Sequence, residues 1–411
     1  MLIRKTRLAL AVAAIFALPV SAFATNGILP VGNGMVSQGM GGAGLANAGE
    51  AAAGMDNPAL ISQTGNAISA GWTIFSPQRK VDTSGIGGSV VKSDSTMFAI
   101  PQAAFTSKIN SDMNWGIMAY AMGGMNTDYP TGPFGAGAPG GNSPQSVNLQ
   151  GLILAPTMSY SVNQDVAVGA SLLLGYETFT TRNLFGMGAN FSTATGQGTA
   201  TGVGVKLGVD AKVADGIDVG AMFQPKLSMG EMNYFKSFLS HFGFTGNAGL
   251  DLPTEYGLGA KFAVGPNVDI LADALYYDWA GVDVFKYFGW KSEPVYKIGA
   301  EYRPTDSLAL RIGYNYGKSP IQGGNSISTN FGPIDVAYAN YPFPAISQGH
   351  ITLGLGYKLD SKATLNAYYL YAPTVTETAT TSSFGGAQTV PAGTKISMSQ
   401  TAFGLGVNYA F

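Results

Sequence analysis

The feature that most constrains this chain is a repeated alternation of large apolar residues with small or polar ones, which runs from about residue 66 to the C-terminus. The clearest segment is the last one, where the large residues are Phe403, Leu405, Val407, Tyr409 and Phe411. Successive side chains of a β-strand point to opposite faces of a sheet. This segment is therefore predicted to be a strand with one large apolar face and one face of small or polar residues.

The alternation predicts strands near 66–76, 95–107, 113–122, 150–161, 165–178, 201–213, 216–229, 252–264, 267–280, 294–303, 307–317, 347–359, 362–373 and 397–411. Short turns, such as 163–164, alternate with long loops, such as 123–149. Barrels of the bacterial outer membrane have short periplasmic turns, long outer loops and an even number of strands. The chain is therefore predicted to be all-β, a transmembrane antiparallel β-barrel of about 14 strands in the outer membrane of a Gram-negative bacterium.

The small number of charged residues supports a membrane barrel. They make up 11% of the chain, against about 25% in soluble domains. Within the predicted strands the charges fall opposite the large apolar residues, as Lys206 and Asp210 do in 201–213. A charged side chain facing lipid costs roughly 2–4 kcal/mol near the middle of the bilayer. The charged face is therefore predicted to line the lumen.

The N-terminus has the parts of a secretory signal peptide. A basic start is followed by the apolar run 8–20 and by a small-x-small cleavage site that ends at Ala24. The next forty residues are rich in glycine and alanine and show little strand character. We therefore expect a signal peptide over 1–24, a separate N-terminal unit over 25–65 and the barrel over 66–411.

Little in the sequence points to catalysis, a cofactor or a metal. The G-x-G-x-x-G pattern within 39–44 lacks the preceding strand that a dinucleotide-binding unit requires. The two histidines, His241 and His350, lack the spacing of a metal site, and there is no cysteine. A Ser-His-acid hydrolase built on His350 is the weaker alternative. Three of the 22 basic residues belong to the signal peptide, so 19 basic and 24 acidic residues leave a net charge of about −5, which argues against a nucleic-acid partner.

The predicted outer loops carry apolar residues that need either cover or a ligand. Loop 230–251 contains four at the spacing of an amphipathic helix, which are Phe235, Phe238, Leu239 and Phe242. The apolar residues of loop 179–200 are Leu184, Phe185, Met187 and Phe191, and those of loop 281–293 are Val284, Phe285, Tyr287, Phe288 and Trp290. Two interpretations are compatible: the loops pack on one another as a lid, or they form a groove that captures an apolar ligand.

Short motifs in a fixed order resemble the FadL/TodX family of outer-membrane transporters for long-chain fatty acids and aromatic hydrocarbons. The N-terminal part carries the glycine-rich 39–44 and then Asp56-Asn57-Pro58-Ala59-Leu60. The central part carries Leu252-Pro253-Thr254-Glu255-Tyr256-Gly257, followed by Trp279. The chain closes on Asn408-Tyr409-Ala410-Phe411. The resemblance spans essentially the whole chain after the signal peptide.

The resemblance implies a fourteen-stranded barrel plugged by an N-terminal hatch inside the lumen. It implies ligand capture between loops 179–200 and 230–251, in a groove made by their apolar residues. It implies that Asn57, Pro58 and Ala59 of the hatch lie against an inward kink in the third strand, placed here at Gly123 and Gly124. Release is then expected sideways through the barrel wall into the outer membrane, without energy input.

The sequence leaves the ligand open between fatty acids and aromatic hydrocarbons, and the resemblance favours fatty acids as the broader assignment of the family. A fatty acid needs a cation near its carboxylate. The loop candidates are Arg182 and Lys236, together with Lys286 and Lys291, unless they are solvated surface charges. A general porin or an adhesin barrel is the alternative of another class.

The expected partners are hydrophobic small molecules, outer-membrane lipid and lipopolysaccharide. The outer-membrane assembly machinery is also expected, through the C-terminal Phe411. We expect no cofactor, no metal, no nucleic acid and a monomeric protein.

Overall fold

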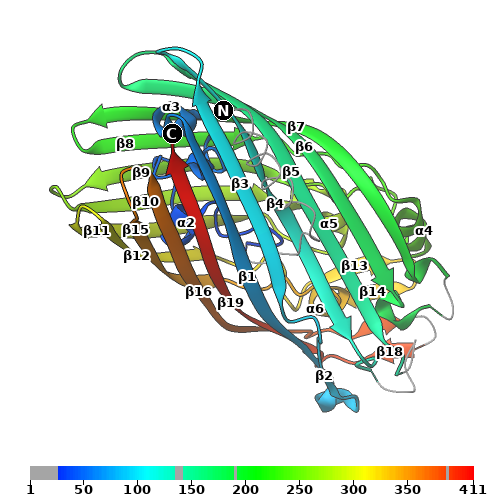
Figure 1. The fold of residues 1–411 in the computed structure, drawn as a ribbon. Coiled ribbons are helices and arrows are strands. Elements are labelled where there is room, and N and C mark those ends of the chain that lie inside the picture. The colour runs from blue at the N-terminus through cyan, green and yellow to red at the C-terminus, as the bar shows by residue number, and fades with distance from the viewer. Residues whose placement is uncertain (1–25, 135–141, 189–191, 386–387) are drawn as a thin grey trace, which may run out of the picture.

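Fourteen antiparallel strands close into one barrel in the computed structural model, which describes residues 26–134, 142–188, 192–385 and 388–411 (Figure 1). The strands are β1 Ala67–Asp82, β3 Phe98–Lys108, β4 Met113–Tyr129, β5 Gln145–Ser161, β6 Val166–Arg182, β7 Gly196–Ala214, β8 Ile217–Gln224, β9 Thr254–Ala263, β10 Val268–Asp278, β11 Glu293–Thr305, β12 Leu308–Gly317, β15 Gly349–Lys358, β16 Ala363–Thr378 and β19 Lys395–Ala410. Strand β1 pairs with β19 along its whole length, which closes the sheet. The predicted barrel is confirmed, while the expected signal peptide over 1–24 lies outside the described residues.

Alternation along each strand separates a lipid-facing surface from the lumen. In β12, Leu310 and Ile312 are 42% and 56% exposed on the outer face, while Arg311 between them is 9% exposed on the inner face. Lys206 and Asp210 of β7 are likewise buried on the inner face. Large apolar side chains exposed around a whole barrel are expected to face lipid. The inward placement of the charged residues is as predicted.

Asn and Asp side chains shape the short turns at one end of the barrel. The Asn110 side-chain oxygen accepts hydrogen bonds from the backbone N–H groups of Asp112 and Met113, at 2.9 and 2.8 Å. Asn163 and Asp360 make the same pair of bonds in their own turns. Such side-chain bonds reverse the chain within a few residues. The start of β1 and the end of β19 lie at this end of the barrel (Figure 1).

Several strands extend further toward the long loops than the alternation predicts. Strand β4 runs to Tyr129 rather than 122, and β7 begins at Gly196 rather than 201. The extensions contain polar residues on their outer face, so hydrophobic alternation no longer marks them. Strand β8 is shorter than predicted by the largest margin and ends at Gln224 rather than 229, because the chain leaves the wall there and buries Leu227 opposite Leu252.

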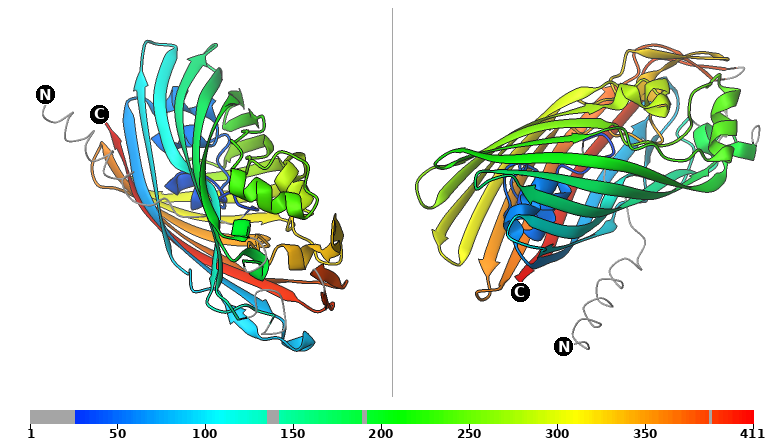
Figure 2. Two further views of the ribbon diagram at one scale, coloured as in Figure 1. Left: turned by 90° about the vertical axis from the view of Figure 1, so that its right-hand side faces the viewer. Right: turned by 90° about the horizontal axis from the view of Figure 1, so that it is seen from above.

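Residues 26–66 form the hatch, which lies inside the barrel rather than in its wall (Figure 2). Its helices are α2 Met35–Gln38, η1 Ala51–Met55, η2 Pro58–Leu60 and α3 Ile61–Thr64. The Asp273 carboxylate of β10 accepts hydrogen bonds from the N–H groups of Gly44 and Leu45, at 2.8 and 3.2 Å. Gly41 has a φ of +69°, and a Cβ there would lie 2.7 Å from the backbone nitrogen of Tyr314. The glycine-rich 39–44 therefore allows close packing of the hatch on the wall.

The long loops carry the remaining elements, most of which gather at the end of the barrel away from the C-terminus (Figure 1). They are η3 Ser84–Ile86, β2 Val90–Lys92, η4 Leu184–Gly186, η5 Ser192–Ala194, α4 Asn233–His241, η6 Trp279–Gly281, α5 Asp283–Tyr287, β13 Ser326–Thr329, β14 Gly332–Asp335, α6 Val336–Ala339, β17 Ser383–Gly385 and β18 Gln388–Val390. In the part of the chain that the structure describes, no helix is long and apolar enough to cross a bilayer.

Candidate functional site

Helix α4 brings together the predicted apolar residues of loop 230–251. Phe235, Phe238 and Leu239 are buried on one face of the helix, and Phe242 follows its last residue. Their i, i+3, i+4, i+7 spacing places them on one side, as expected for an amphipathic helix. The amphipathic helix predicted from this spacing in loop 230–251 is confirmed over Asn233–His241.

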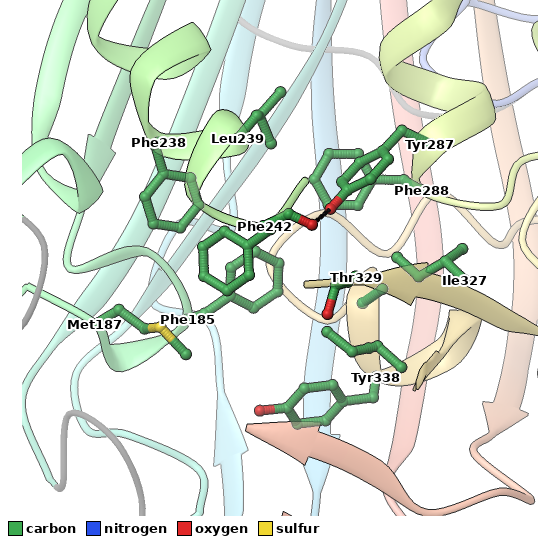
Figure 3. Close-up of a pocket in the computed structure, with 12 residues that line it drawn as sticks. Phe185, Met187, Phe238, Leu239, Phe242, Tyr287, Phe288, Ile327, Thr329 and Tyr338 are labelled. Atoms are coloured by element: carbon green, nitrogen blue, oxygen red, sulfur yellow. Dashed lines mark hydrogen bonds between the residues drawn. The ribbon is translucent and has the colours of Figure 1, made fainter. Parts of the chain in front are cut away.

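Residues from four outer loops enclose a small cavity beside α4 (Figure 3). The lining of this outer pocket is Phe185, Met187, Phe238, Leu239, Phe242, Tyr287, Phe288, Ile327, Thr329, Ile334, Tyr338 and Ala339. The cavity measures about 30 Å³, which is room for roughly one water molecule. Ligand pockets are usually about 300–1,000 Å³. The loops are therefore in a closed arrangement, and side chains must separate to admit a ligand.

Phe185 contacts aromatic residues from three other loops. Its ring stacks on those of Phe238 and Phe288, with centroids 6.3 and 6.4 Å apart, and meets Tyr341 edge-on at 5.6 Å. The backbone of Phe185 has a φ of 55°, in the left-handed region that residues with a side chain rarely adopt. Strain of this kind often accompanies functional positions. Loop 179–200 therefore presents a strained aromatic residue to the other loops.

The other predicted apolar residues of these two loops differ in their placement. Met187 lines the outer pocket, and Leu184 is buried without lining it. Phe235 packs edge-on against Phe179 of β6, with ring centroids 4.9 Å apart. Phe191 lies outside the described residues.

Arg182 and Lys236, the predicted partners of a ligand carboxylate, do not line the pocket. Arg182 is the last residue of β6, and its Nη2 lies 2.5 Å from Oδ1 of Asp128. Lys236 Nζ lies 2.6 Å from Oε2 of Glu231. Both cations are about half exposed, at 48% and 47%, and exposed pairs of this kind contribute little to stability. Both residues therefore lie apart from the described lining of the pocket, and their role as carboxylate partners stays a prediction.

The described lining of the outer pocket contains no charged side chain. Its polar groups are hydroxyls, and the Tyr287 hydroxyl already donates to the Phe242 carbonyl oxygen at 2.8 Å (Figure 3). The Thr329 hydroxyl likewise donates to the carbonyl of Gly332 at 2.8 Å. The pocket therefore offers aromatic and aliphatic surface and little that would hold an ion.

The sequence analysis missed one wall of the pocket, which the hairpin β13–β14 and α6 contribute through Ile327, Ile334 and Tyr338. Loop 318–346 has no long apolar run and so shows no periodic signal. Asp335 holds this wall in place. Its carboxylate accepts from the Ala337 N–H at 2.9 Å and from the Thr380 N–H, in the last outer loop, at 3.0 Å.

A second cavity of about 50 Å³, the inner cavity, lies between the hatch and the wall. Part of its apolar lining is Leu29 of the hatch, Ala121 and Met122 of β4, and Ile153 of β5. Its charged residues are Asp56, Lys206, Glu255 and Lys297. The inner cavity is therefore mixed in character, with two acids and two bases, whereas the outer pocket is apolar.

Strand β4, the third strand of the barrel, is irregular at the predicted position of the kink. Its pairing with β5 shifts between Ala121 and Gly123, and Gly123 has a φ of 138°. Such a bulge bends a strand. The Gly124 N–H donates to the Ile28 carbonyl of the hatch at 3.1 Å. A Cβ at Gly123 would lie 2.7 Å from the same oxygen, so the kink and the hatch touch through their backbones.

The resemblance implies that the segment 57–59 packs on this kink. In the structure the segment packs mainly on β6 and β7 instead. The Asn57 side chain donates to the Val209 carbonyl of β7 at 2.9 Å. Gly208 of β7 and Gly169 of β6 leave room for the segment, since a Cβ at either position would collide with it. The expected placement is therefore corrected: the start of the hatch meets the kink, and 57–59 anchors the hatch to other strands.

A closed barrel with an apolar outer face, a hatch in its lumen and an apolar pocket among its outer loops defines a transport channel of the outer membrane. A family model described as outer membrane protein transport protein (OMPP1/FadL/TodX) matches residues 21–411. The chain belongs to this family of outer-membrane transporters of hydrophobic compounds. The family and the Gram-negative outer-membrane location predicted from the sequence are thus confirmed.

Several solved structures have the same fold. The toluene transporter TodX of P. putida has a TM-score of 0.69 at 20% identity, over 92% of this chain and 99% of TodX. The toluene transporter TbuX of Ralstonia pickettii has a TM-score of 0.64 at 17% identity, over 92% and 98%. A Pseudomonas aeruginosa FadL homologue has a TM-score of 0.65 at 15% identity, over 96% and 100%. No curated protein sequence matches the chain.

Proposed function

We propose that this protein takes up uncharged hydrophobic compounds passively, and that monoaromatic hydrocarbons fit it best. The observation that carries the proposal is the outer pocket, whose described lining has aromatic, aliphatic and hydroxyl-bearing side chains and no charged one. An aromatic hydrocarbon has no group that requires a charged partner. The rings of Phe185, Phe238 and Phe242 offer faces and edges against which it can pack. Two similar solved structures are toluene transporters, which agrees with this choice.

Hydrophobic burial supplies the affinity for capture. Each buried methylene contributes about 0.8 kcal/mol, so the seven carbons of toluene correspond to roughly 6 kcal/mol before any cost. Ordering the ligand and separating the pocket side chains reduce this value. The net affinity is then weak, which suits a site that must pass its ligand on.

Release is proposed to run from the inner cavity sideways through the wall at the kink of β4. Ala121 and Met122 border the inner cavity, and Gly123 and Gly124 touch the hatch. A hatch movement would change the contacts both at the inner cavity and at the kink of β4. Two hatch states with different ligand affinity would let a ligand captured in one state leave from the other, with its concentration gradient as the driving force.

Long-chain fatty acids are the second candidate ligands. The observation in their favour is that Lys206 and Lys297 line the inner cavity, where they could face a carboxylate. Asp56 and Glu255 line the same cavity and oppose this with two acidic groups. The charge balance therefore ranks fatty acids below uncharged ligands.

The proposal is tested by uptake of labelled toluene and oleate into cells that lack such a channel and express this protein. Phe238→Asp places a charge in the apolar pocket and is expected to lower toluene uptake by about tenfold or more. Ser240→Asp, on the exposed side of α4, is the matched control and should leave uptake unchanged. Oleate uptake alone would move the protein to the fatty-acid class, and uptake of neither would favour a porin or an adhesin.

A further inference from the structure

The outer pocket and the inner cavity are joined by continuous apolar packing. One cluster of buried residues contains Phe238 and Met187 of the outer pocket together with Met122 and Ile153 of the inner cavity. The same cluster contains further methionines, among them Met118, Met125, Met222, Met229 and Met232. Methionine side chains are unbranched and repack readily. A ligand that moves from one cavity to the other therefore passes through an adaptable apolar core.

The inner face of β6 borders this route. Phe179, toward the outer end, packs against Phe235 of α4. Gly175, toward the inner end, pairs with Ile153 of the inner cavity. Glu177 lies between Phe179 and Gly175 on the same inward face of the strand. An acidic side chain thus stands on the inward face of β6, between a position that pairs with a residue of the inner cavity and a position that packs on α4.

Glu177 is fully buried, and neither oxygen of its carboxyl group has a hydrogen-bond partner among the described residues. Its neighbours across the two ladders are Gly151 and Ala200, which have no polar side-chain atoms. The charged group that acts electrostatically on Glu177 is another acid, Asp251. The Oδ2 atom of Asp251 lies 3.4 Å from Nζ of Lys226. A buried polar group without a partner is costly. Glu177 therefore provides an acceptor that the protein itself leaves unused.

Other buried acids of the molecule have clear structural partners. Asp273 accepts from two N–H groups of the hatch, and Asp335 accepts from the backbone of two outer loops. Each of them ties separate chain segments together. Glu177 ties nothing together in the described structure, so its chemistry points to a ligand rather than to the fold.

We propose that Glu177 accepts a hydrogen bond from the hydroxyl or amino group of a neutral aromatic ligand that passes between the two cavities. The inference rests on the proposed uptake of aromatic compounds and adds a preference for phenols and anilines over plain hydrocarbons. A carboxyl group keeps an acceptor oxygen in either protonation state. A carboxylate ligand brings no donor and meets the acidic pair Glu177 and Asp251, so it is disfavoured.

The test compares cellular uptake of p-cresol with that of p-xylene, which carries a methyl group in place of the hydroxyl. Glu177→Leu removes the acceptor at similar volume, and Glu177→Gln keeps one acceptor oxygen. Thr178→Leu introduces the same side chain at the next position, on the other face of β6, and is the matched control. We expect the p-cresol to p-xylene uptake ratio to fall about fivefold in Glu177→Leu, the value of one net hydrogen bond. The other two variants should change it by less than about twofold.

An unchanged ratio in Glu177→Leu protein that keeps the gel mobility of a folded barrel would overturn the proposal. A competition measurement on the unaltered protein covers the case in which this variant fails to fold. There, p-cresol should inhibit uptake of labelled p-xylene at about fivefold lower concentration than unlabelled p-xylene does, and p-toluate should inhibit least. Equal inhibition by p-cresol and p-toluate would overturn the proposal. Failure to take up either p-xylene or p-cresol would instead contradict the proposed function.

Discussion

At the scale of single residues, charge in this molecule has two different uses. Arg182 and Lys236 form exposed ion pairs at the outer end of the barrel and take no part in the pocket. Asp335 is fully buried and organises the loops that carry one pocket wall. The sequence does not distinguish these cases, because the burial of a loop acid depends on which other loop folds over it.

Asp335→Ala removes the acceptor for backbone N–H groups of Ala337, Thr380 and Thr381. Each buried N–H left without a partner costs about 1 kcal/mol or more, so the hairpin β13–β14 should detach locally while the barrel remains folded. The outer pocket then loses Ile327 and Ile334, and we expect toluene uptake to fall several-fold. Limited proteolysis of intact cells should cleave loop 318–346 faster in Asp335→Ala than in Asp335→Asn, which keeps one acceptor. Equal cleavage rates would contradict this role.

At the scale of elements, the sequence predicts the strands well within the bilayer and poorly beyond it. The last strand was predicted over 397–411 and forms over Lys395–Ala410, because apolar residues alternate along its length. The hairpin β13–β14 lies in the outer loop region and has no lipid-facing side. Its sequence therefore lacks the alternation of apolar and polar residues that predicts a strand of the barrel. The register shift in β4 was placed from the resemblance, since a pair of glycines alone does not distinguish a bulge from an ordinary turn.

The kink of β4 depends on Gly123. Its φ of 138° is accessible to glycine, and any Cβ would approach the Ile28 carbonyl oxygen to 2.7 Å. Gly123→Ala should therefore separate the kink from the start of the hatch and lower toluene uptake several-fold, with the barrel still assembled. Gly85→Ala, where a Cβ meets open space, is the matched control. Uptake in Gly123→Ala equal to that of the control would show that the kink has no part in release.

At the scale of the whole molecule, the barrel holds its hatch through contacts that no local pattern predicts. The separation of an N-terminal unit from the wall follows from composition, because 25–65 is rich in glycine and alanine and lacks alternation. Composition does not, however, predict which strand of the wall each hatch segment contacts. Asn57 bonds to β7, and Gly44 bonds to Asp273 of β10, although these partners are more than 150 residues away in the chain.

Glu50 links hatch docking to pH. Burial raises the pKa of its carboxyl group from 4.5 to about 7, against the opposing effects of the Val36 N–H, which donates to Oε1 at 2.7 Å, and of Arg311. A released hatch exposes Glu50 and returns its pKa to the ordinary value. Between about pH 4.5 and 7 the docked hatch therefore binds a proton that the released hatch does not. Docking is most stable below this window and weakens as the pH rises through it, by roughly 3 kcal/mol in total.

This linkage makes hatch release pH-dependent in a direction that can be measured. Hydrogen exchange of the hatch amides, corrected for the intrinsic effect of pH on exchange, should be faster at pH 7.5 than at pH 5. Glu50→Gln removes this titrating group at nearly constant shape, so its corrected exchange should rise less between pH 5 and pH 7.5 than that of the unaltered protein. If passive uptake requires hatch movement, toluene uptake should rise with pH in the unaltered protein and rise less in the variant. A corrected exchange rate that rises with pH equally in both proteins would exclude Glu50 as the responsible group.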